Sequence, residues 1–167
     1  YNTYNKVIYQ KTPDAGVSNF WYDPLARLVL SQNALQAGAD HYSYSLYDEL
    51  SRINEVGRIE NASTLNCSGG PCTYLALSGF VTNATARNEV VKTYYDEGIN
   101  TNLTQNNLLM RVAATTYSSN YSTSIQAYEN ATHYSYDISG NVKTVTQENK
   151  ELDNAYEVWK VLSAEFD

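Results

Sequence analysis

The sequence lacks the features that mark a membrane-spanning, metal-binding or nucleotide-binding protein. No apolar run approaches the length of about 18 to 20 residues that crosses a bilayer. The two cysteines lie far in sequence from the two histidines, His41 and His133, so the spacing of a zinc site is missing. No P-loop, Gly-x-Gly-x-x-Gly or His-Glu-x-x-His motif occurs. We therefore expect no metal, no cofactor and no membrane span.

Positive charge is also scarce. The 167 residues include 11 Lys and Arg against 18 Asp and Glu, which gives a formal net charge of -7. Such a chain repels phosphate backbones, so we expect no nucleic-acid partner. Nucleophilic catalysis needs a base oriented beside the nucleophile, and no motif around His41 or His133 supplies one. We expect both histidines to be hydrogen bonded on a sheet surface, and the chain not to be an enzyme.

The abundant residue is tyrosine, with 16 Tyr against 3 Phe and 1 Met. Tyr, Thr and Val favour half-buried pleated surfaces. This composition predicts an all-β fold of antiparallel hairpins. The exception is the segment from Asn149 to Phe166, where Leu152, Tyr156 and Trp159 follow a 3.6-residue rhythm. A short C-terminal helix and a strand are both open alternatives there.

A Tyr-Asp pair recurs along the chain, each time after an alternating run and before a turn. We expect one segment over residues 1–167, with units near 18–31, 42–59, 89–98 and 132–147. Successive pairs lie 25, 48 and 41 positions apart, and the two longer gaps suggest repeats that have lost their signature. The motif residues are Tyr22, Asp23, Tyr47, Asp48, Tyr95, Asp96, Tyr136 and Asp137.

The last unit predicts its own turn. Tyr134 and Tyr136 share one strand face, because side chains alternate along a strand. Asp137 is placed to accept hydrogen bonds from the backbone of the turn that follows. Gly140 can take a positive φ without a Cβ penalty. In the first two units, Ala26 and Ser51 occupy the position of this glycine, so we expect those turns to adopt another geometry or to be strained.

Two polar insertions, near 60–88 and 118–130, separate the units and predict long surface loops. The first contains Cys67 and Cys72 around a Ser-Gly-Gly-Pro sequence that reverses the chain tightly. We expect a disulfide between them, with a pair of free loop thiols as the alternative.

The exposed chemistry of the chain suggests contacts with sugars. Six Asn-x-Ser/Thr sequons are possible glycan-bearing positions if the chain passes through a eukaryotic secretory pathway. Trp21 with Tyr22, or Tyr42 with Tyr44, would form a stacking platform for a sugar, although cross-strand packing is the simpler role. The sequon residues are Asn61, Asn66, Asn83, Asn102, Asn120 and Asn130.

The Tyr-Asp-x-x-Gly-Asn sequence at Tyr136 to Asn141, within a tyrosine-rich alternating strand, resembles the YD repeat of the RHS/teneurin family. Tyr22 to Arg27 and Tyr47 to Arg52 are similar, and segments such as Asn5 to Gln10 are similar to Bacteroidetes-type members. The resemblance implies hairpins joined edge to edge into a coiled sheet that forms a hollow shell. In bacterial members the shell often encloses a toxin; in teneurins it belongs to an adhesion receptor.

These features predict a structural role. We expect a shell or scaffold segment of a secreted or cell-surface protein, with an enclosed toxin domain as a possible partner. A carbohydrate-binding adhesion module and a self-assembling extracellular filament subunit are the alternatives. The strand-like start and the unfinished pattern at Phe166-Asp167 lead us to expect further repeats of the same polypeptide, or copies of this chain, at its sheet edges.

Overall fold

The computed structural model describes residues 5–63, 65, 67, 72–121 and 127–150, together with the backbone of 159–163. The chain forms two compact units, Tyr1–Asn88 and Glu89–Asp167. Both are built from antiparallel strands, so the all-β prediction is confirmed at that level. Each unit is described separately below.

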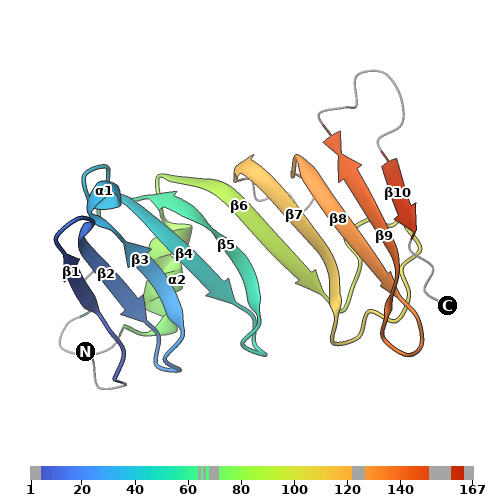
Figure 1. Ribbon diagram of the computed structural model, residues 1–167, viewed down its shortest axis with the longest axis horizontal. Helices are drawn as coiled ribbons and strands as arrows, with labels where there is room; N and C mark the ends of the chain where they lie inside the picture. Colours follow the sequence, from blue (N-terminus) through green and yellow to red (C-terminus); the bar gives the residue numbers. More distant parts are fainter. Residues whose placement is uncertain are drawn as a thin grey trace. The chain divides into compact units, whose positions relative to one another are not determined.

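Unit 1 is a sheet whose strands pair in chain order (Figure 1). The strands β1 to β5 are joined by short connections, and β4 with β5 forms the longest ladder among them, with seven residue pairs. The helix α2 follows β5, and the first residues of β6 close the unit. The elements are β1 Tyr9–Thr12, β2 Gly16–Tyr22, β3 Leu28–Gln32, α1 Ala34–Ala37, β4 His41–Tyr47, β5 Ile53–Glu60, α2 Tyr74–Thr82 and β6 Ala86–Tyr95.

Unit 2 contains the remainder of β6 and four more strands, β7 Val112–Asn120, β8 Asn130–Tyr136, β9 Val142–Asn149 and β10 Trp159–Ser163. β7, β8, β9 and β10 pair as successive antiparallel neighbours. Of the two alternatives left open for the C-terminal segment, the strand is correct at Trp159–Ser163, which pairs with β9, and the helix is wrong there. Hydrogen bonding to β9 outweighs the 3.6-residue spacing of apolar residues in this segment. The rest of that helix proposal, apart from Asn149 and Lys150, lies outside the described residues.

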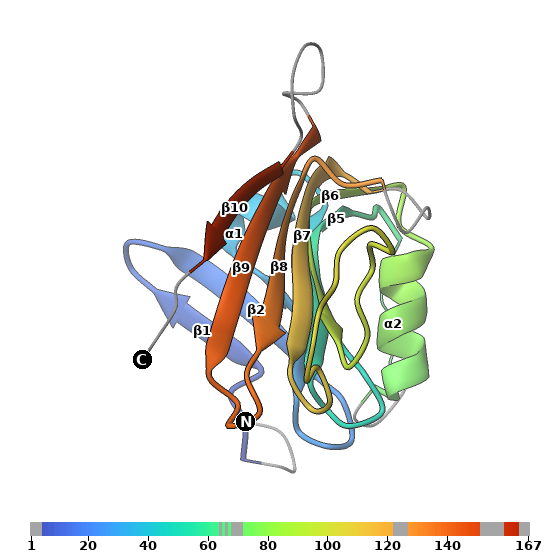
Figure 2. The same ribbon diagram turned by 90° about the vertical axis from the view of Figure 1, so that its right-hand side faces the viewer.

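The core of unit 1 lies between the sheet and α2 (Figure 2). Strand alternation puts Leu30, Tyr44 and Ile59 on the sheet face that α2 covers. Leu77, Phe80 and Val81 of α2 pack on this face, and all six side chains are buried. Apolar area removed from water is the main force that holds the helix on the sheet.

The insertion near 60–88 is not a loop throughout, because α2 occupies its second half. Thr73 caps the helix, with its side chain accepting from the Ala76 N–H, and Asn83 ends it. The polar flanks obscured this helix in the sequence. A shorter helix, α1, begins with a capping box at Asn33, whose side chain bonds the Gln36 N–H while Gln36 bonds back. Among the described residues, no helix is long and apolar enough to cross a membrane.

Candidate functional site

The Tyr-Asp pairs mark turns in which the aspartate holds its own backbone. In the β2–β3 turn, Asp23 Oδ1 accepts the N–H groups of Leu25 at 3.0 Å and Arg27 at 2.9 Å. Arg27 Nε donates to Asp23 Oδ2 at 2.7 Å. The residue four positions after the aspartate, here called Asp+4, therefore bonds the carboxylate with both its backbone and its side chain. The Asp23 N–H donates to the Arg27 carbonyl, and the Ala26 N–H to the Asp23 carbonyl. The Asp23 side chain is fully buried by this cage.

The β4–β5 turn repeats this pattern. Asp48 Oδ1 accepts from the N–H groups of Leu50 and Arg52, and Arg52 Nε donates to Oδ2 at 2.6 Å. Partial burial raises the pKa of Asp48, but the hydrogen bonds from Arg52 and Leu50 outweigh it, so the net pKa lies below the ordinary value. The carboxylate is therefore the form that the turn binds.

The β8–β9 turn has the same form with a neutral partner. Asp137 Oδ1 accepts from the Asn141 N–H at 2.9 Å, and Asn141 Nδ2 donates to Oδ2 at 3.0 Å. The hydrogen bond from the Asn141 side chain is the first cause of a lowered pKa at Asp137. As the sequence predicted, this turn runs through Ser139 and Gly140.

The residue before Asp+4 is left-handed in all three turns. The φ angles are +60° at Ala26, +64° at Ser51 and +95° at Gly140. The turns at Ala26 and Ser51 thus keep the geometry of the glycine-containing turn, and the expectation of another geometry is wrong. The carboxylate cage fixes the backbone, and an L side chain in this region costs about 1–2 kcal/mol. The alternative expectation, strain, is the one that fits.

Each of these hairpins also carries a bulge at the same place. The pairing steps from Trp21 opposite Leu30 to Tyr22 opposite Leu28, which leaves Val29 as the extra residue. The same shift occurs between Leu46 and Tyr47, and between Ser135 and Tyr136. The extra residue is therefore always the sixth after the aspartate. A bulge increases the local twist of the strand pair.

The fourth pair, Tyr95-Asp96, starts an enlarged version of the turn in unit 2. The Asp96 N–H donates to the Arg111 carbonyl, Asp96 Oδ1 accepts from the Met110 N–H, and Met110 has a φ of +61°. Arg111 thus occupies the place of Arg27, with a longer loop between. The uneven spacing of the pairs therefore comes from this loop and from the α2 insertion. The expectation of repeats that had lost their signature is wrong.

Arginine and tyrosine link one turn to the next. In unit 1, the Arg27 guanidinium lies 4.4 Å from the centre of the Tyr47 ring, and the Tyr47 hydroxyl donates to the Leu28 carbonyl at 2.8 Å. Arg27 Nη1 also donates to Ser51 Oγ, on the left-handed residue of the second turn. Sequence reasoning missed this role of Arg27, although an arginine follows both Asp23 and Asp48 by four positions.

Unit 2 contains the same link. The Arg111 guanidinium lies 5.4 Å from the centre of the Tyr136 ring, and the Tyr136 hydroxyl donates to the Val112 carbonyl at 2.9 Å. A Cβ at Gly140 would stand 2.6 Å from Arg111 Nη2, so any larger residue there would require the Arg111 guanidinium to shift. Burial raises the pKa of the linking tyrosines, Tyr47 and Tyr136.

An inserted segment completes the backbone bonding of each linking tyrosine. In unit 1, the Tyr74 hydroxyl of α2 accepts from the Tyr47 N–H at 2.8 Å and donates to the Tyr47 carbonyl at 2.9 Å. In unit 2, the Tyr136 N–H donates to the Asn106 carbonyl, and Asn107 Nδ2 donates to the Tyr136 carbonyl. Tyr47 and Tyr136 lie beyond the ends of the β3–β4 and β7–β8 ladders, so those ladders give their backbone groups no partner on the preceding strand. The inserted segments supply those hydrogen bonds instead.

The two histidines lie in different surroundings. His41 is partly exposed, with Nε2 3.4 Å from Glu60 Oε1. His133 is buried, not on the surface as predicted, with Nε2 3.3 Å from Glu148 Oε2, which also accepts from the Tyr128 hydroxyl at 2.7 Å. Burial lowers the pKa of His133, although Glu148 opposes this, and burial raises that of Tyr128. Within the described ranges, no cluster of three metal-ligating side chains forms.

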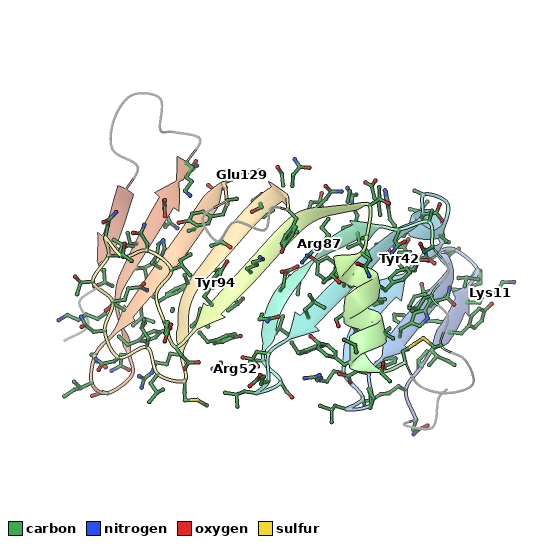
Figure 3. All side chains as sticks on the ribbon, turned by 180° about the vertical axis from the view of Figure 1, so that it is seen from behind. Lys11, Tyr42, Arg52, Arg87, Tyr94 and Glu129 are labelled. Atoms are coloured by element: carbon green, nitrogen blue, oxygen red, sulfur yellow. A yellow bond between two sulfur atoms is a disulfide. The ribbon has the colours of Figure 1, made fainter. Side chains whose placement is uncertain are left out.

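The aromatic pairs considered as sugar platforms pack inside unit 1. Trp21 meets Tyr42 edge-on at 5.8 Å between ring centres, and Tyr42 meets Phe80 of α2 at 5.2 Å. Figure 3 shows Tyr42 on the α2 side of the sheet. Tyr44 is buried, with its hydroxyl donating to Glu55. Trp21, Tyr42 and Tyr44 are therefore part of the core and not an exposed platform.

The cysteine loop and the sequons are placed as follows. Cys67 and Cys72 form a disulfide with their Cα atoms 5.2 Å apart, and Cys72 is buried in the core of unit 1. Asn61 is buried, with its amide nitrogen donating to the Phe80 carbonyl, which leaves no space for a glycan on the folded chain. Asn83, Asn102 and Asn120 are exposed, Asn130 is partly buried in β8, and Asn66 lies outside the described residues.

A comparison with protein-family models finds no match, and a search of curated proteins finds none with significant similarity.

Proposed function

We propose that this chain is a structural segment of a secreted or cell-surface scaffold built from YD-type β-hairpins, similar to the shells of the RHS/teneurin family. The observation that carries the proposal is the link between successive turns. Arg27 and Tyr47 in unit 1, and Arg111 and Tyr136 in unit 2, make the same contacts at equivalent positions. A motif whose charged and aromatic side chains join one hairpin to the next is suited to building a continuous sheet.

The use of the polar side chains supports the same role. The aspartates of the three short turns are bonded to their own turn backbones. His133 is closed off from solvent beside Glu148, so it is not placed to meet a substrate. A scaffold needs rigid, satisfied turns of this kind, whereas a catalytic group needs access. The disulfide in unit 1 suits an oxidising compartment.

The test uses the native polypeptide that contains this chain. We expect electron microscopy of that protein to reveal a hollow, closed particle in which this segment resists proteolysis. Substituting alanine for both Arg27 and Arg111 should make this segment protease-sensitive, while Lys11→Ala, which removes an exposed cation from β1, should not. Separate globular domains with no enclosing wall would contradict the proposal.

Self-association through a sheet edge is a second candidate function. Ile8 and Tyr9 are 40% and 55% exposed at the start of β1, the first strand of the sheet order. An edge with exposed apolar side chains favours pairing with another strand. Sedimentation of the chain over a range of concentrations tests this. Concentration-dependent assembly that is lost on Ile8→Lys supports it, and a monomer at high concentration contradicts it.

A further inference from the structure

A row of side chains crosses the face of unit 1 opposite to α2. Phe20 on β2 stands opposite Ser31 on β3, Ser31 opposite Ser43 on β4, and Ser43 opposite Arg58 on β5. Residues directly opposite in a ladder share a face. The adjacent row, Trp21 to Leu30 to Tyr44, belongs to the face that α2 covers. The Phe20-to-Arg58 row therefore lies on the face that α2 leaves uncovered.

Arg58 is the unusual member of this row. Within the described residues, no hydrogen bond or ion pair engages its guanidinium, and its Nε is buried. The carboxylate two positions along the same strand face, Glu60, bonds Asn88 Nδ2 at 3.2 Å and faces His41 Nε2 at 3.4 Å. In a chain of net charge -7, a partly buried arginine without an anion is an unused binding group.

The residues between Arg58 and Phe20 are small and polar. Ser43 Oγ accepts from Gln36 Nε2 of α1 at 2.8 Å, so its own proton is available to a ligand. Ser31 and Ser43 form a low floor between the guanidinium at one end and the ring of Phe20 at the other. Three strand spacings separate these ends, a distance of about 14 Å. That span fits one or two sugar rings.

We propose that this row binds an acidic sugar, a uronic acid unit of a polysaccharide. The carboxylate takes the fork of Arg58 in two parallel hydrogen bonds, which suits guanidinium better than any point charge. The serine hydroxyls bond the ring hydroxyls, and the apolar face of a neighbouring sugar packs on Phe20. A few placed polar groups beside an aromatic surface are the usual composition of such a site. This site is independent of the structural role proposed above.

The test titrates the isotope-labelled chain with digalacturonic acid and follows backbone amide shifts by NMR. We expect shifts at Ser31, Ser43 and Arg58, with a dissociation constant on the order of millimolar. Arg58→Gln should weaken binding at least about tenfold. Arg58→Lys, which keeps the charge and loses the fork, should weaken it less. Lys11→Gln makes the same charge change on β1 and should leave binding unaltered.

Any of four results would overturn the proposal. The first is the absence of shifts at tens of millimolar ligand. The second is equal binding by Arg58→Gln with an unchanged melting curve. The third is equal binding of neutral galactose. The fourth is equal binding of inorganic sulfate with no effect of Phe20→Leu, which would identify a simple anion contact. If Arg58→Gln does not fold, Arg58→Lys and Phe20→Leu provide the same comparison. None of these results bears on the turn links, so the two proposals fail separately.

Discussion

Arg27→Ala should be one of the most damaging single substitutions at the surface of unit 1. The Asp23 side chain is fully buried and the Arg27 side chain is 16% exposed, with Nη2 2.6 Å from Asp23 Oδ2. Removing one partner of a buried ion pair costs about 3–5 kcal/mol. Asp23 Oδ1 keeps its two backbone donors, so the lower end of that range applies. Loss of the contact with the Tyr47 ring adds about 0.5–1 kcal/mol, which gives a total of about 3.5–4 kcal/mol.

The assay is equilibrium unfolding in urea, followed by tryptophan fluorescence in a Trp159→Phe background, so that the signal comes from Trp21, which packs against the core of unit 1. A double-mutant cycle with Asp23→Ala isolates the pair, and the double variant should lose at least about 1 kcal/mol less than the sum of the single variants. Lys11→Ala is the control, with a change of about 0.5 kcal/mol or less. An Arg27→Ala variant within about 1 kcal/mol of the parent, or strictly additive losses, would refute the reasoning.

Three further predictions concern the same units. Ala26→Gly should stabilise the chain by about 0.5–1 kcal/mol in the same urea assay, because the left-handed strain at Ala26 exceeds the entropic cost of glycine; destabilisation would contradict this. Tyr74→Phe should lower the free energy of unfolding by about 2 kcal/mol, because it leaves the Tyr47 N–H and carbonyl without their partner. A loss under about 0.5 kcal/mol would show that the hydrogen bonds from α2 to Tyr47 are dispensable. Burial holds the Tyr128 proton more tightly in the folded chain, so this stabilisation is complete below pH 10 and is lost as the pH rises above it. Tyr128→Phe should therefore flatten the alkaline decline in stability, and an unchanged slope would exclude that tyrosine as its cause.

The features predicted correctly from the sequence are those encoded within a few residues. Asp137 and Gly140 specify their turn locally, because the carboxylate reaches only its own backbone and the glycine supplies the positive φ. Ala26 and Ser51 misled, because the preference of an alanine or serine for negative φ is weaker than the hydrogen bonds that an aspartate cage provides. The left-handed residue is set by the cage as well as by its own identity.

The features missed depend on contacts between distant segments. α2 is held by burial of Leu77, Phe80 and Val81 against the sheet, and its polar flanks are those of a loop. The number of residues between Tyr-Asp pairs includes such insertions. Spacing alone therefore suggested that intervening repeats had lost their Tyr-Asp signature. The link from Arg27 to Tyr47 joins residues 20 positions apart. The sequence contained the arginine at Asp+4, but not the ring that it would contact.

The central claim is that equivalent arginine–tyrosine links join successive hairpins in both units. Double-mutant cycles for Arg27 with Tyr47, and for Arg111 with Tyr136, test it most directly, using Ala for each arginine and Leu for each tyrosine. We expect favourable coupling of about 0.5–1.5 kcal/mol in both cycles, because the guanidinium of each arginine lies over the ring of its tyrosine in a cation–π contact. Coupling in one unit and none in the other would contradict the claim that the motif is a repeated structural device.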